Sequence, residues 1–185
     1  ARIDAEERLS TFRRYEEVVL WFDTCLYDHV ILVRHLDWFS RQALGDTQLS
    51  LICVEKGLGY HSPEELAALL QTKQVVTAGQ LSLGVRAWES YRSPTPTDVE
   101  MLLADGTVEL PYLHAAFIEH LRRFPSTRDG LGSVDRVVLS KVAQLGPVAL
   151  PRLIGECLGN GRLTYLSDSL AATHARDMAT CSQPL

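Results

Sequence analysis

The chain has 185 residues, of which 46% are hydrophobic and 22% charged, and its formal net charge is −5. This composition is typical of a globular protein that buries roughly 70% of its unfolded surface, and the negative charge argues against a general affinity for nucleic acid or anionic membranes. Because no apolar run reaches the roughly 18 to 20 residues of a membrane span and the N-terminus is charged, we expect no membrane association and a soluble, cytoplasmic protein. The four cysteines (25, 53, 157 and 181) form no C-x-x-C pair, which favours reduced and mostly buried thiols.

A βαβ unit is predicted near the start of the chain. A short helix is predicted over residues 4–15. The run EVVLWF (17–22) that follows has apolar residues at both odd and even positions, as in a parallel strand covered on both faces. Apolar residues at helical spacing predict a crossover helix over 26–42, and LSLICV (49–54) predicts a second buried strand. The crossover is expected to be right-handed.

Two strands are too few for a stable sheet, since typical sheets have about five or six. We therefore expect the sheet to be completed either by a missing N-terminal segment upstream of Ala1 or by another subunit of a homo-oligomer. Residues 1–60 form the predicted α/β layer.

Helical signals dominate the rest of the chain. Capping boxes are predicted at Ser62 with Glu65 and at Thr77 with Gln80, and each marks a helix start. Two further helices are predicted, one from Thr95-Pro96 to Gly106 and one from Leu110-Pro111 to about Phe124. The four predicted helices together form a helical region over 61–132, which we expect to pack on the α/β layer. The fold class is thus α/β, a small parallel βαβ layer followed by a mainly helical C-terminal region.

The last segment, 133–185, predicts three short helices over 133–146, 149–159 and 166–179, an arrangement that resembles a helix-turn-helix lobe. Residues 111–185 carry 8 Lys+Arg against 6 Asp+Glu, a net charge of only +2. The third helix offers His174 and Arg176 against two aspartates, whereas DNA-reading helices carry more positive charge. Helical packing is therefore favoured, and DNA binding is kept as an alternative.

Polar residues follow both predicted strands. Asp23 follows the first strand and Glu55 the second, so parallel pairing brings both carboxylates to the same edge of the sheet, where α/β proteins bind ligands. Asp28 lies in the first turn of the crossover helix, and the loop GLGYHS adds polar and small residues. We call this set the rim: Asp23, Asp28, Glu55, Gly57, Gly59, Tyr60 and His61.

Several functions fit the rim. It could bind a small molecule in a non-enzymatic or regulatory protein, or Asp23 and Glu55 could hold a divalent cation while His61 moves protons in a hydrolase or transferase. Against both stands a structural role, because acids at this position also cap helices. Cys25 at the helix N-terminus would have a lowered thiol pKa if exposed. No complete catalytic set or common nucleotide or hydrolase motif occurs, so the catalytic residues, the cofactor and the ligand stay unassigned.

The order of three sequence blocks resembles an uncharacterised bacterial family, the domain of unknown function number eighteen thirty-five. The blocks are LWF-acid with LYD, then GLG followed by SPEELAALLQTKQVVTAGQLSLGVRAWESYRSPTP, then LPYLHAAFIEHLRRFPSTRDGL. The similarity covers about residues 17–168 and implies a further α/β segment before the LWF strand. The pattern GLGSVDRVVL is loosely similar to the fourth region of sigma factors.

The chain departs from the family pattern at two places. Where the family is expected to have WFEHD, this chain has Trp-Phe-Asp-Thr-Cys at 21–25, without the His and one of the acids. Where Phe-Leu-Gly-Asp is expected, the chain has Tyr-Leu-Ser-Asp at 165–168. An active rim in the family would therefore be altered here.

Overall fold

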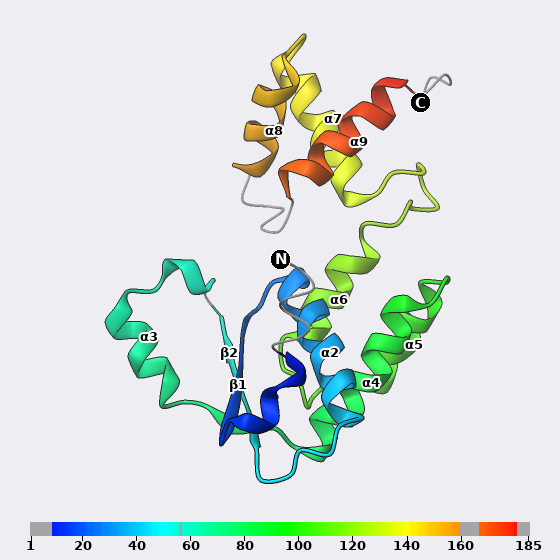
Figure 1. The fold of residues 1–185 in the computed structure, drawn as a ribbon. Helices are drawn as coiled ribbons and strands as arrows, with labels where there is room; N and C mark the ends of the chain where they lie inside the picture. Colours follow the sequence, from blue (N-terminus) through cyan, green and yellow to red (C-terminus); the bar gives the residue numbers. More distant parts are fainter. Residues whose placement is uncertain (1–8, 56, 160–166, 181–185) are drawn as a thin grey trace. The chain divides into compact units, whose positions relative to one another are not determined.

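The computed structural model describes residues 9–55, 57–159 and 167–180. The chain divides into two compact units, Ala1–Phe117 and Ile118–Leu185, and each is described by itself (Figure 1). The dividing point falls inside helix α6 (Leu113–Leu121). Residues 4–8 of the expected first helix, Tyr165 and Leu166 of the altered family motif, and Cys181 lie outside the described residues.

The first unit contains a mixed three-stranded sheet in the order β1-β2-β3. Strands β1 (Glu17–Asp23) and β2 (Gln48–Val54) are parallel, in a register that sets Asp23 opposite Val54. Helix α2 (Leu26–Ser40) connects them, so the predicted βαβ unit is confirmed. Strand β3 (Gln74–Val75) pairs antiparallel with β2 and was not predicted, because a two-residue exposed strand has no periodicity.

The core of this unit lies around α2, where Leu32, Val33 and Leu36 are completely buried. Helix α4 (Ala78–Arg92) packs closely on α2 at Gly84, where a Cβ atom would come within 2.3 Å of Leu36 Cβ. Figure 1 shows α2 and α4 side by side, with α2 against the sheet. The packing holds the start of α2 fixed at the carboxyl ends of β1 and β2.

Local sequence signals set the remaining elements of this unit. Both predicted capping boxes are present, Ser62 with Glu65 at the start of α3 and Thr77 with Gln80 at the start of α4. Gly106 ends α5 with φ of +98°, a conformation that favours glycine. The other elements are η1 (Phe12–Arg14), η2 (Leu58–Tyr60), α3 (Pro63–Leu70) and α5 (Thr97–Asp105).

The three predicted C-terminal helices are present in the second unit as α7 (Ser133–Leu145), α8 (Leu150–Leu158) and α9 (Asp168–Thr180). They enclose a core of their own, made of Val134, Val138, Leu153, Cys157 and Ala171. The chain bends by 118° between α7 and α8, through a turn that begins at Gly146 with φ of +69°.

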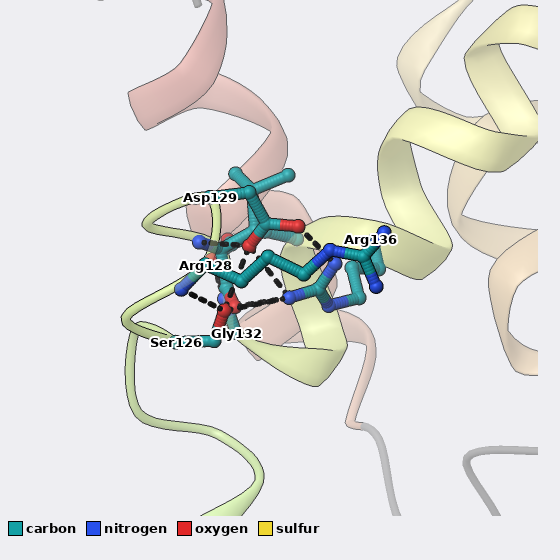
Figure 2. Close-up of polar contacts among 7 residues, drawn as sticks. Ser126, Arg128, Asp129, Gly132 and Arg136 are labelled. Carbon is teal, nitrogen blue, oxygen red and sulfur yellow. Dashed lines mark hydrogen bonds and ion pairs between the residues drawn. The ribbon is translucent and has the colours of Figure 1, made fainter.

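An ion-pair network fixes the loop that precedes α7 (Figure 2). The Arg136 guanidinium donates to both carboxylate oxygens of Asp129, with Nη2 2.6 Å from Oδ1, and also to the Ser126 hydroxyl and the Leu131 carbonyl. These bonds hold the pKa of Asp129 well below its usual range, chiefly through Arg136. The charge of Arg136 is therefore paired with Asp129 and stabilises this loop.

Within the described ranges, no single helix is both long and apolar enough to cross a membrane. Helices α7 and α8 meet that length and hydropathy only when taken together as a bent pair.

Candidate functional site

The rim begins where β1 turns sharply into α2. Asp23 is the last residue of β1 and Cys25 is the N-cap of α2. The Cys25 amide donates to Asp23 Oδ1 at 2.8 Å, and the Asp23 amide donates to Asp28 Oδ2 at 2.8 Å. The Asp28 amide in turn donates to Cys25 Sγ at 3.3 Å. Three side chains thus bind three main-chain amides within one turn.

The two acids therefore bind main-chain amides at the start of α2, as expected, but neither of them is the N-cap residue. The N-cap is the thiol of Cys25, while Asp23 binds the amide of Cys25 and Asp28 binds the amide of Asp23. These two carboxylates also offset the positive end of the α2 dipole. An anionic ligand consequently gains little from this helix N-terminus.

Each acid still has acceptor capacity, because a carboxylate offers about four lone-pair sites. Ligand atoms of Asp23, Cys25 and Asp28 all lie within 4.8 Å of one another. Asp23 Oδ1 accepts the Cys25 amide and Asp28 Oδ2 accepts the Asp23 amide, so each carboxylate keeps lone-pair sites beyond its main-chain bond. A donor from outside the chain could therefore bind here.

The loop after β2 approaches this acid pair closely. A Cβ atom at Gly57 would lie 3.4 Å from Asp23 Oδ2 and 3.2 Å from the Tyr60 ring, so the missing side chain allows both to approach the loop. Tyr60 is 78% exposed and offers a free aromatic face beside the acids. A Cβ atom at Gly59 would meet nothing within 4 Å, so no close approach depends on this glycine.

The last two rim residues lie differently from the acid pair. The Glu55 carbonyl accepts a hydrogen bond from Thr24 Oγ1 at 3.1 Å, but its exposed carboxylate does not belong to the group of Asp23, Cys25 and Asp28. His61 Nδ1 lies 3.5 Å from Glu65 Oε2, at the start of α3. The structure thus places Cys25 and Asp28, rather than Glu55, beside Asp23.

The two thiols near this site are poor nucleophiles. Burial raises the pKa of Cys25 to about 12, and the carboxylates of Asp23 and Asp28 act in the same direction. Burial also raises the pKa of Cys53 to about 11, with a contribution from Asp28. The lowered pKa considered for Cys25 depended on exposure, and Cys25 is buried. A thiol that stays protonated at neutral pH is a poor nucleophile.

Sequence reasoning missed two contributors to the site. Thr24 joins the β1 end to the β2 end through Glu55, and Cys53 lies close enough to Asp28 to respond to its charge. The parallel register could have indicated Cys53, since it pairs with Phe22, one residue before Asp23.

Comparisons of this chain with protein-family models, with curated proteins and with solved structures gave no match. The assignment of function therefore rests on the site itself.

Proposed function

We propose that the chain is a small-ligand-binding or regulatory protein, with its ligand at the rim. The observation that carries the proposal is the acid pair Asp23 and Asp28, which retains acceptor capacity beside the exposed ring of Tyr60. The position at the carboxyl ends of two parallel strands is the one where α/β proteins bind ligands.

The chemistry of the rim selects the ligand class. Two carboxylates with spare lone pairs accept hydrogen bonds from ammonium or hydroxyl groups, and an exposed tyrosine ring stacks on a flat or cationic group. We infer an uncharged or cationic molecule that combines hydroxyl or amino donors with a ring, such as a nucleoside or an aromatic amine.

Thermal unfolding with a panel of nucleosides and aromatic amines tests the proposal. A ligand at about 100 times its dissociation constant stabilises the protein by about 2.7 kcal/mol, which is readily measured. Asp23→Asn keeps an oxygen for the Cys25 amide but replaces an acceptor by a donor, so it should abolish the shift. Asp177→Asn, on an exposed position of α9, is the matched control. A panel without any response, or an unchanged response in Asp23→Asn, would contradict the proposal.

The metal-assisted hydrolase or transferase is tested by the same assay with Mg²⁺ and Mn²⁺. The clustering of Asp23, Cys25 and Asp28 is the observation in its favour, and the two carboxylates supply the oxygen ligands that Mg²⁺ and Mn²⁺ prefer. Stabilisation by either ion that disappears in Asp23→Asn would support this alternative over the non-enzymatic one.

DNA binding by the second unit is a second candidate, favoured by the 118° bend and the four-residue turn between α7 and α8. Against it, the exposed charges of α9 are Asp168, Arg176 and Asp177, a net negative set. A gel shift on duplex DNA across a range of salt decides, because phosphate contacts make affinity fall steeply with salt. Absence of retention at low salt would remove this candidate.

A further inference from the structure

We propose a second binding site at the amino-terminal ends of β1 and β2, for a compact zwitterion that carries an oxyanion and an ammonium group. The site is a cavity of about 380 Å³ lined by residues 13–16 and 44–47, which we call the amino pocket. Its volume lies in the range of small-molecule sites. It shares no residue with the rim and is independent of the function proposed there.

Hydrogen bonds between its two segments make the amino pocket rigid. The Thr47 hydroxyl donates to the Tyr15 carbonyl at 2.9 Å, and the Gln48 amide donates to the Glu16 carbonyl at 2.8 Å. Two residues before Thr47, Gly45 takes a positive φ of +63°, which lets the 44–47 segment turn. A site held this way is formed before the ligand arrives, so binding costs little ordering of the backbone.

One arginine of the amino pocket is held in place. Arg13 Nε donates to the Ala43 carbonyl at 2.7 Å, and its guanidinium lies 5.6 Å from the centre of the Phe12 ring. Phe12 is buried and packs edge-on against Trp38 and Phe39 of α2. The remaining N–H groups of Arg13 are therefore presented from a fixed position.

Among the described residues, the other charges in the amino pocket form no ion pairs. Arg14, Glu16 and Asp46 are exposed, and none has an ion-pair partner among the residues that the structure describes. Two guanidinium groups and two carboxylates thus share one cavity without neutralising each other through direct ion pairs. Tyr15, 61% exposed, adds an aromatic edge.

This charge distribution selects a ligand with both signs of charge. Guanidinium groups pair with phosphate or carboxylate through two parallel hydrogen bonds, which directs the oxyanion towards Arg13 and Arg14. The carboxylates of Glu16 and Asp46 accept hydrogen bonds from an ammonium group and repel a second anion. A purely anionic ligand would leave both acids unpaired near its charge.

O-phosphoethanolamine is the probe, because it joins one phosphate to one ammonium group. It is titrated into the full chain by calorimetry at constant ionic strength, with inorganic phosphate and ethanolamine as the two half-ligands. We expect saturable binding of O-phosphoethanolamine, weaker binding of phosphate and none of ethanolamine.

Two variants separate the roles of the charges. Arg14→Gln should weaken the binding of O-phosphoethanolamine and of phosphate about tenfold or more, since it removes a charge-assisted hydrogen bond to the oxyanion. Asp46→Asn should weaken only O-phosphoethanolamine. Arg152→Gln, which removes an exposed arginine of α8, is the control and should change neither.

Three results would overturn the proposal. The first is no saturable binding of O-phosphoethanolamine. The second is equal binding by the wild type and Arg14→Gln. The third is equal affinity for O-phosphoethanolamine and inorganic phosphate in both the wild type and Asp46→Asn. Circular dichroism of each variant confirms that the fold is retained. Asp23→Asn, which alters the rim and not the amino pocket, should bind O-phosphoethanolamine as tightly as the wild type does.

Discussion

At the scale of single residues, burial decides the chemistry at the start of α2. The sequence places Cys25 and His29 beside a helix N-terminus, where exposed groups of these types are reactive. Cys25 is 8% and His29 only 1% exposed, and desolvation is the largest influence on the pKa of both. Desolvation disfavours the charged form, so both side chains are neutral in the fold at neutral pH.

The raised thiol pKa values predict resistance to alkylation. The pKa of Cys25 rises from 9.0 to about 12, which lowers its thiolate fraction about a thousandfold near neutral pH. In the folded chain at about pH 8, iodoacetamide should therefore modify Cys25 and Cys53 far more slowly than in the chain unfolded in urea. Peptide mass spectrometry measures the two rates. Rapid labelling of Cys25 in the folded protein would show that this thiol is activated instead.

Burial of His29 predicts a loss of stability in mild acid. Its pKa is lowered from 6.5 by desolvation, so the unfolded chain takes up a proton that the folded chain refuses. The free energy of unfolding should thus decrease as pH falls through 6.5 towards the lower pKa of the folded state. His29→Gln removes this titration and can retain a bond to the Cys25 carbonyl, which His29 Nδ1 contacts at 3.2 Å.

Urea denaturation at about pH 7.5 and about pH 5.5 checks this expectation. The variant should lose less stability than the wild type between the two pH values. His120, whose pKa is also lowered by burial, is present in both proteins and cancels in the comparison. Equal losses would mean that His29 does not carry the effect.

At the scale of elements, the contact of α2 with α4 depends on one missing side chain. The α4 backbone approaches α2 at Gly84, where Leu36 fills the space that a Cβ atom would occupy. Closely packed interiors do not accept an additional methyl group without displacement of their neighbours. The rim residue Asp28 lies on α2, and the N-cap of α2, Cys25, is bonded to Asp23. The contact of α2 with α4 therefore also positions the candidate site.

Gly84→Ala should accordingly destabilise the protein, by about 1 to 3 kcal/mol or more from overpacking, despite the gain of about 0.5 to 1 kcal/mol that alanine brings to a helix. Gly155→Ala is the control, because a Cβ atom there meets nothing within 4 Å. It should stabilise α8 by about that smaller amount. Chemical denaturation followed by circular dichroism measures both. A neutral Gly84→Ala would show that α2 and α4 can separate without cost.

The sequence predicts these elements well where the signal is local. Both capping boxes and the βαβ unit follow from patterns within a few residues, and their physical causes act over the same range. Strand β3 could not be predicted, because its two residues pair only once β2 is in place. The proximity of Asp23 and Gly57 follows from parallel pairing, whereas the choice of Cys25 as N-cap depends on the local turn geometry.

At the scale of the whole molecule, the two units have separate cores. The core of the second unit consists of residues from α7, α8 and α9. All three tryptophans, Trp21, Trp38 and Trp88, belong to the first unit. Tryptophan fluorescence therefore reports unfolding of the first unit, while far-ultraviolet circular dichroism reports helices in both.

This difference allows the independence of the units to be measured. Leu153 is 6% exposed in the core of the second unit, and its replacement by alanine should cost about 2 to 5 kcal/mol. If each core folds on its own, Leu153→Ala moves part of the dichroism transition to lower urea and leaves the fluorescence midpoint unchanged. Val99→Ala, in the buried face of α5, should do the reverse and lower the fluorescence midpoint. A parallel shift of both signals in both variants would instead mean that the chain unfolds as one cooperative body, since only then does damage to one core lower the stability of the other.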